Sequence, residues 1–370
     1  MDHSRQGRLL EPQALSIAAP PSPPSAEAQL EFLAKLQRLF AEGDFTATYK
    51  FALLIALSDL AVEWALDDGA ALALSNRQIA DRFIQLYWRH STPYGTGRPD
   101  VEPGVLIQNI GAQAAVLRDI QNFRASSVAT TLNQARNATA FQQLIGNVAR
   151  TVSAQPLNFL QNFGGFTDPF LYERSKGGVV LKPGVAYCLR RFYPLVQQLA
   201  RTHWVDHIKG NRRNRSILGA GGDLEDFLFG TSRQSLAIIS AQLIKLEGRR
   251  CFYCGQPLQL PDVDHFIPFA LYPRDVAHNF VLAHPACNRS KSDSLAAKRH
   301  LEKWLERLVK GAADLDEIGA AAGIAASGTT AHRVAAWGYA NACEAGGRAW
   351  VKPSTYESLD DSVLRLMDSI

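Results

Sequence analysis

Two short pairs of metal-ligating residues stand out, because their types and spacing could hold a metal ion. Cys251 and Cys254 form a CxxC pair, and His284 and Cys287 form an HxxC pair that begins thirty residues after Cys254. Thiolates and imidazoles are the ligands that tetrahedral Zn²⁺ prefers. Gly255 allows the tight turn that aims both thiolates of the first pair at one ion. We therefore predict a structural zinc site. Unligated buried cysteines, or a three-ligand site with His284 facing solvent, are the alternatives.

A second set of polar residues is interleaved with these pairs. It comprises an Asp-His pair, a central Asn and a final Asn, namely Asp264, His265, Asn279 and Asn288. The intervals are 14 residues from His265 to Asn279 and 9 residues from Asn279 to Asn288. In type, order and spacing this set resembles the motif of HNH endonucleases, of the free-standing bacterial kind that is stabilised by zinc. The resemblance covers residues 251–293, and it implies a β-hairpin followed by a helix, the ββα-metal fold.

The resemblance also implies a role for each residue in phosphodiester hydrolysis. His265 would act as the general base, since histidine exchanges protons near neutral pH. Asp264 and Asn288 would hold Mg²⁺ or Mn²⁺ through oxygen atoms, and that ion would stabilise the transition-state charge and the leaving group. Asn279 would orient His265 by hydrogen bonding near its backbone. Adjacent strand residues face opposite sides, so Asp264 and His265 can share one site only if the strand ends or bends there.

Basic residues inside and outside the motif are candidates for phosphate contact. Lys291 and Arg289 lie on the helix that is expected to face the scissile phosphate. A basic stretch at 209–215, expected to be a loop, could follow a nucleic-acid backbone. Its candidate residues are Arg212, Arg213 and Arg215. A plain solvated role is the alternative for each of these side chains.

The elements that must position these residues are expected to be mainly helical. Residues 1–26, with their run of Pro and Ser, predict a disordered tail, and 27–220 predict a mainly helical domain for recognition or regulation. A short β-hairpin is expected within 170–181. Residues 221–310 are expected to hold a linker helix and the HNH module, and 311–370 a C-terminal helical region. The predicted fold class is mainly α with a small α+β module.

Composition narrows the class of protein. The chain has 370 residues, of which 46% are apolar and 20% charged, as in ordinary globular proteins. No apolar run reaches the roughly 18 residues that spanning a bilayer needs, and the first residues lack the apolar core of a signal peptide. We therefore expect a cytoplasmic protein without membrane contact. Five cysteines, an odd and sparse set, do not indicate a disulfide framework.

The predicted function is a metal-dependent endonuclease that hydrolyses DNA, in restriction or phage defence, with RNA as the alternative substrate. The net charge of +4 permits a phosphate-rich partner without demanding one. One HNH site cuts one strand, so a homodimer, or a protein partner that supplies specificity, remains open. The rival prediction is a zinc-stabilised nucleic-acid-binding module that does not cleave, or a nuclease subunit that depends on a partner.

Overall fold

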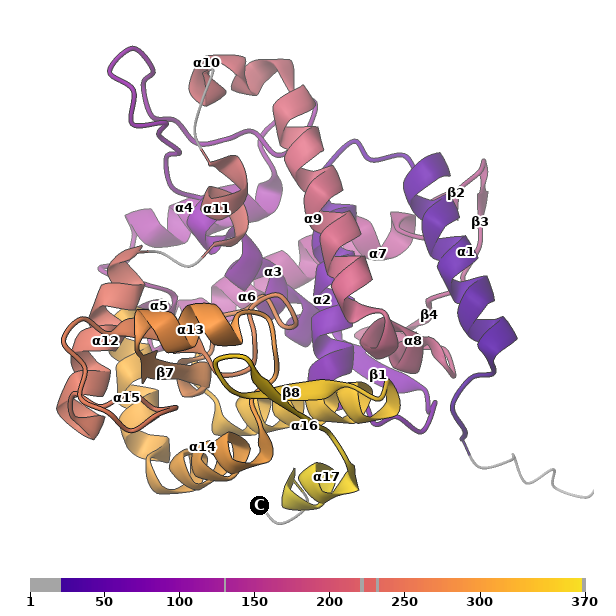
Figure 1. Cartoon of the computed structure of the whole chain (residues 1–370). Coiled ribbons are helices and arrows are strands. Elements are labelled where there is room, and N and C mark those ends of the chain that lie inside the picture. The colour runs from indigo at the N-terminus through magenta and orange to yellow at the C-terminus, as the bar shows by residue number, and fades with distance from the viewer. Residues whose placement is uncertain (1–20, 130, 220–222, 231–232, 368–370) are drawn as a thin grey trace, which may run out of the picture.

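The computed structural model describes residues 21–129, 131–219, 223–230 and 233–367. Residues 1–20 of the predicted tail lie outside this range, and the first helix begins at Ala26. Figure 1 shows the orange and yellow elements of the second half gathered at one corner of the molecule, against the indigo to pink helices of the first half. The architecture is mainly α with a small α+β module, as predicted.

The first half forms a helical domain with short strands. Its helices are α1 (Ala26–Glu42), α2 (Tyr49–Trp64), α3 (Asn76–His90), α4 (Ala115–Ala125), α5 (Leu132–Arg136), α6 (Phe141–Ala154), α7 (Pro156–Phe159), α8 (Val185–Arg191), α9 (Tyr193–Gly210), η1 (Arg212–Asn214), α10 (Arg215–Leu218) and α11 (Leu224–Phe229). Its strands are β1 (Leu72–Ser75), β2 (Asn162–Phe163), β3 (Phe166–Thr167), β4 (Tyr172–Ser175) and β5 (Gly178–Leu181).

Helix α2 is the centre of this domain. All of its residues except Trp64 are buried, because apolar side chains cover almost its whole circumference. The helix nevertheless buries two carboxylates, Asp59 and Glu63, near its C-terminal end. Helix α3 begins directly after Ser75, since Ser75 and Gln78 form a reciprocal capping box.

The predicted hairpin is present, and it is part of a larger sheet. Strands β4 and β5 pair antiparallel around a turn at Gly177, which has a φ of +81°. Strand β1 adds to the other edge of β5, with Leu72 opposite Leu181, and gives the order β1-β5-β4. The sequence did not reveal β1, because four residues directly before a helix cap carry little strand signal.

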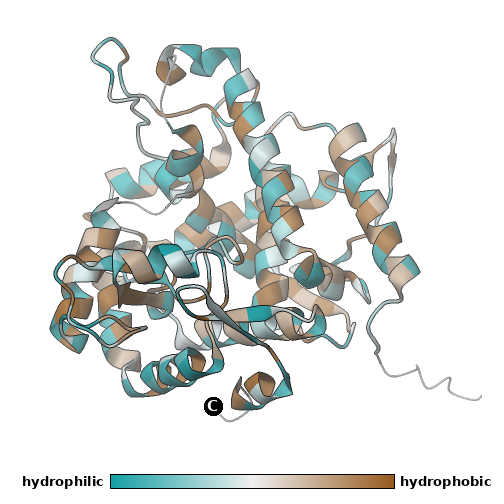
Figure 2. Ribbon diagram, viewed as in Figure 1, coloured by the Kyte–Doolittle hydropathy of each residue, from teal (hydrophilic) through white to brown (hydrophobic). Residues whose placement is uncertain are grey.

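The second half contains the predicted module and the C-terminal region. Its elements are α12 (Arg233–Glu247), β6 (Asp262–His265), η2 (Ala277–Asn279), β7 (Phe280–Ala283), α13 (Pro285–Lys291), α14 (Lys298–Lys310), α15 (Ala312–Ala322), α16 (Gly328–Glu344), β8 (Arg348–Lys352), β9 (Thr355–Ser358) and α17 (Asp361–Met367). In Figure 2 the buried strand β7 is brown, whereas the visible face of α14 is mostly teal. The hairpin β8–β9 interrupts the helical region expected at 311–370.

A single hydrophobic core joins the module to the C-terminal region. Trp304, Trp337 and Trp350 are fully buried in it, together with all four residues of strand β7. Tyr193 of α9 also belongs to this core and packs edge-on against Trp337, so the core reaches into the first half. Within the part of the chain that the structure describes, none of the helices combines the length and apolar character needed to cross a membrane.

Candidate metal centre and nuclease site

The two cysteine-containing pairs converge on one point. Cys251 and Cys254 lie on the turn after α12, His284 is the residue before α13, and Cys287 lies in the first turn of that helix. Their ligand atoms all lie within 4.8 Å of one another, and Cys254 Sγ is 3.3 Å from His284 Nδ1. Bond lengths of 2.3 Å to sulfur and about 2.0 Å to nitrogen set the ligand atoms of a tetrahedral zinc roughly 3.5–3.8 Å apart. The cluster can therefore hold a metal ion.

Hydrogen bonds prepare these groups to act as ligands. His284 Nε2 bonds the Pro257 carbonyl at 3.0 Å, which leaves the lone pair on Nδ1, beside the Cys254 sulfur. Burial acts to raise the pKa of Cys251, but N–H groups directed at its sulfur lower it to about 7. Burial, together with the charges of the two neighbouring thiolates, raises the pKa of Cys287 to about 12. A bound cation would remove that repulsion, so the donor set fits zinc.

The predicted β-hairpin and helix are β6, β7 and α13. The strands pair antiparallel, with Asp264 opposite Val281 and His265 opposite Phe280. Strand β6 ends at His265, which meets the condition for Asp264 and His265 to serve one site. Asn279 is buried and clamps the turn that follows, because its side chain accepts from Ile267 N at 2.7 Å and donates to Ile267 O at 2.9 Å.

The carboxylates of β6 face helix α13. Asp262 and Asp264 are two residues apart and so share one face of the strand. Asn288 Nδ2 lies 3.2 Å from Asp262 Oδ2, which leaves Asn288 Oδ1 outside this bond. Asp264 is buried; it accepts a hydrogen bond from Tyr253 Oη at 2.5 Å and lies 3.1 Å from Lys291 Nζ. Between β6 and α13 the structure therefore gathers two carboxylates and an amide, donors of the oxygen type that Mg²⁺ prefers.

His265 turns toward a different set of partners. Its Nε2 lies 3.0 Å from Asp275 Oδ1, and its ring packs against Phe280 and Phe269 at centroid distances of 4.4 and 5.1 Å. Both the His265 and the Asp275 side chains keep some exposure, 16% and 20%. Sequence reasoning did not find Asp275, since nothing in its local pattern distinguishes it. It also passed over Asp262, which its alternation with Asp264 along the strand could have revealed.

The candidate phosphate-binding residues are scattered. Lys291 is fully buried and its ammonium bonds Asp264 and the His265 carbonyl, at 2.8 Å from that oxygen, so it faces inward rather than toward solvent. Arg289 is exposed on α13. The stretch at 209–215 is not the loop that we expected: it comprises the end of α9, the turn η1 and the start of α10. Figure 1 shows α10 at the opposite end of the molecule from α14. Its arginines, Arg212, Arg213 and Arg215, are exposed there.

Comparison with known families covers both halves of the chain. The model of a family described as a domain of unknown function, DUF8808, matches residues 29–224, more than half of the chain. The chain belongs to this family. Residues 251–297 match a family described as HNH endonuclease, which confirms the resemblance seen in the sequence. These residues include the cysteine–histidine cluster and the ββα unit, so the DUF8808 domain here is joined to a module that is similar to HNH endonucleases. No match was found among curated proteins.

Proposed function

We propose that the HNH module of this DUF8808 protein hydrolyses phosphodiester bonds in DNA, with the help of a divalent ion. The supporting observation is the arrangement at the end of β6. There His265 is bonded to Asp275 at 3.0 Å, and the carboxylates of the same strand face α13. The match of residues 251–297 to the HNH endonuclease family gives the class of reaction.

His265 is the proposed general base. When Nε2 carries the proton and donates it to Asp275 Oδ1, the lone pair lies on Nδ1, the nitrogen that can take a proton from an attacking water. Asp275 is then a positioning residue, because it fixes the ring and its tautomer without touching the substrate. Asn279 supports the same geometry from the other side, through its two bonds to the Ile267 backbone.

Asp264 and Asn288 are the proposed ligands of Mg²⁺ or Mn²⁺, with Asp262 beside them. Their oxygen atoms suit a hard cation, and such an ion supplies charge neutralisation at the phosphate and at the leaving oxygen. Lys291 now neutralises Asp264, so its ammonium and a divalent ion would compete for the same carboxylate. Arg289, exposed on α13, is the better candidate for phosphate contact within the module.

The cysteine–histidine cluster is proposed to hold zinc for stability alone. Cys251, Cys254, His284 and Cys287 would fill all four positions of a tetrahedral ion and leave none for water. The cluster ties the turn after α12 to the start of α13, which places Asn288 and Lys291 opposite β6. Restriction or phage defence, with a second copy or a protein partner supplying specificity, is the setting that we propose for the activity.

A cleavage assay tests this proposal. Purified protein is incubated with Mg²⁺ or Mn²⁺ and supercoiled plasmid, single-stranded DNA or RNA. We expect nicking of DNA, and a fall of about 10²- to 10⁴-fold in His265→Ala, the usual contribution of a general base. Asp275→Asn should lower kcat by less, with KM unchanged. The control is His332→Ala, which removes a half-buried histidine of α16 outside the site.

Two results would contradict the proposal. Cleavage that survives His265→Ala unchanged would show that another group, or a contaminating nuclease, does the chemistry. Binding of nucleic acid without turnover, whichever divalent ion is present, would favour the rival function, a zinc-stabilised binding module or a subunit that needs a partner.

A further inference from the structure

A cavity lined by arginines lies between the DUF8808 domain and the HNH module. Its volume is about 230 Å³. This is smaller than the roughly 300–1,000 Å³ of pockets for drug-sized ligands, so it suits a single anionic group rather than a whole cofactor. Both halves of the chain contribute its cationic side chains, which are Arg82 and Arg89 of α3, Arg136 of α5, Arg201 of α9 and Arg274 of the module.

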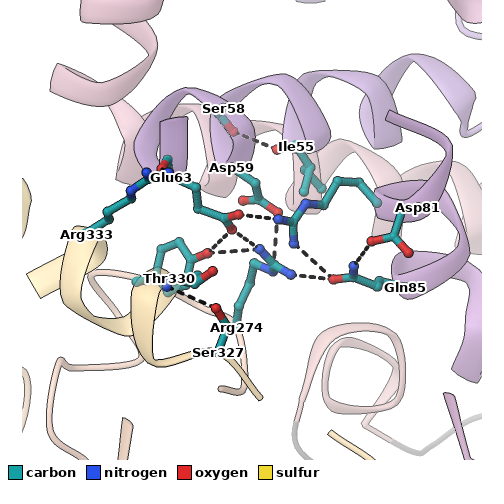
Figure 3. Close-up of polar contacts among 12 residues, drawn as sticks. Ile55, Ser58, Asp59, Glu63, Asp81, Gln85, Arg274, Ser327, Thr330 and Arg333 are labelled. Carbon is teal, nitrogen blue, oxygen red and sulfur yellow. Dashed lines mark hydrogen bonds and ion pairs between the residues drawn. The ribbon is translucent and has the colours of Figure 1, made fainter. Parts of the chain in front are cut away.

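Two of these arginines are neutralised by the carboxylates of α2. Arg82 and Arg274 both bond Glu63, and Arg274 Nε lies 3.5 Å from Asp59 (Figure 3). All four side chains are buried or nearly so. Burial opposes the charge of Arg274, but its acidic neighbours raise its pKa well above the ordinary value, so it stays cationic. This cluster forms a rigid, charge-balanced wall of the cavity.

Arg89 and Arg201 have no carboxylate partner among the ion pairs of the described residues. Arg89 donates only through Nη1, to two backbone carbonyls of the segment 226–230. Arg201 donates through Nη2 to Pro273 O at 2.9 Å and through Nε to Gln197 Oε1 at 3.3 Å. No hydrogen bond within the described residues uses Nε or Nη2 of Arg89, or Nη1 of Arg201. Within the described residues, the hydrogen bonds of these two guanidinium groups therefore go only to neutral oxygens.

Aromatic rings hold these two guanidinium groups in place. Arg89 lies over the Phe227 ring at 5.3 Å and Arg201 over the Phe229 ring at 4.7 Å, both from α11. A stacked guanidinium keeps its N–H edge free for a planar, forked contact with an oxyanion. Burial lowers the pKa of Arg201, although the charges of Asp59 and Glu225 act in the opposite direction. Within the described residues, the buried Nε of Arg136 has no hydrogen-bond partner.

The cavity also adjoins the proposed catalytic histidine. Asp275 lines it directly after Arg274, and the same carboxylate bonds His265 Nε2. A group held by the arginines would thus lie one side chain away from the proposed base. The arginines without carboxylate partners come from the DUF8808 domain, so this domain supplies the binding charge and the module supplies the chemistry.

We propose that the cavity binds a phosphate group through Arg89 and Arg201, and that the DNA strand cut by the module provides it. The second part of this inference rests on the proposed nuclease function. A free phosphate anion has the same chemistry, so the experiment separates these two sources.

The test uses the full-length His265→Ala protein loaded with zinc, so that binding is measured without turnover. One arm follows labelled single-stranded DNA by fluorescence anisotropy over a range of salt concentrations. The other follows the rise in melting temperature with inorganic phosphate. Arg89→Gln and Arg201→Gln are compared with Arg98→Gln, which removes an exposed arginine elsewhere. Arg201→Lys keeps the charge but loses the forked geometry, and circular dichroism reports the folding of each variant.

We expect each glutamine variant to weaken DNA binding by about tenfold or more, the usual value of a charge-assisted hydrogen bond. The slope of log affinity against log salt should fall by about 1, and Arg201→Lys should be intermediate. Loss of the phosphate effect alone, with DNA binding intact, would identify free phosphate as the ligand.

If the Arg89→Gln and Arg201→Gln variants bind both DNA and inorganic phosphate as well as the Arg98→Gln control does, the inference is wrong. The outcomes for the nuclease proposal are separate. If the wild type does not cleave DNA but its binding still depends on the arginines, the nuclease proposal is refuted and the phosphate site stands. If cleavage depends on His265 but the arginine variants bind as the control does, the phosphate site is refuted and the nuclease proposal stands.

Discussion

Replacing Lys291 by methionine should destabilise the protein strongly, because it breaks a buried ion pair. The Lys291 side chain is 0% exposed and that of Asp264 9% exposed. The ammonium is 3.1 Å from one Asp264 oxygen and 2.8 Å from the His265 carbonyl. Burial lowers the pKa of Lys291, while Asp264 acts to keep the proton on it. Without the ammonium, Tyr253 Oη is the one side-chain hydrogen-bond donor left to the Asp264 carboxylate within the described residues. Removing one partner of such a pair costs about 3–5 kcal/mol.

Urea denaturation of the zinc-loaded protein, followed by tryptophan fluorescence, measures this cost, since Trp304 and Trp350 lie in the same core. In a double-mutant cycle with Asp264→Asn, the two substitutions together should cost clearly less than their sum, because the second removes the charge that the first leaves unpaired. Lys310→Met is the control. It breaks a lysine–glutamate pair that is exposed on α14, and it should leave the midpoint unchanged.

A loss below about 1 kcal/mol for Lys291→Met, the usual size for an exposed pair, would refute this reasoning. It would mean that the pair opens in solution and that Lys291 is free to contact phosphate, as the sequence suggested. Mg²⁺ gives a second readout. If it binds Asp264, it should raise the stability of Lys291→Met more than that of the wild type, since the ion replaces the missing charge.

Two further predictions concern zinc and pH. Cys254→Ser should lose the bound zinc measured by metal analysis and unfold the module, whereas Cys343→Ser, outside the cluster, should keep one zinc per chain; equal zinc content in both would refute the assignment. Burial lowers the pKa of His90 to about 4, from an ordinary 6.5. The unfolded chain therefore binds the proton more tightly, so this contribution to stability is complete above pH 6.5 and is lost as pH falls toward 4. The free energy of unfolding, measured by urea denaturation, should fall by about 3 kcal/mol between pH 7 and pH 4 through this group. His90→Gln should reduce that fall, and the same pH dependence in the variant would exclude His90 as the cause.

Local sequence signals predicted the mainly helical class, the hairpin within 170–181 and the metal cluster. Lys298–Lys310 is helical, and its buried apolar side chains recur on one face. The zinc ligands were identifiable because each pair is closed by a short turn or by one turn of helix, so its geometry depends on neighbours in the chain. Cys251, Cys254, His284 and Cys287 accordingly come together as expected.

Contacts between distant segments were not predictable in this way. Arg274 and Glu63 are 211 residues apart, so no local pattern in the sequence connects them. The pairing of Asp275 with His265 depends on the path of an irregular loop, which no periodicity describes. Lys291 was a candidate for phosphate contact because it lies on the helix that was expected to face the scissile phosphate. The direction of its side chain, however, depends on how α13 packs on β6.

The ion pairs at Glu63 also limit how independently the two halves of the chain can be exchanged by recombination. Arg274 takes its charge partners from α2 of the DUF8808 domain, and the next residue, Asp275, holds the ring of His265. A chimera that carried residues 251–297 on another scaffold would separate Arg274 from its carboxylate partners Asp59 and Glu63. It would also free the loop that carries Asp275. Recombination should therefore preserve this HNH module together with its own α2, and substitutions at Arg274 and Glu63 should be accepted only in pairs.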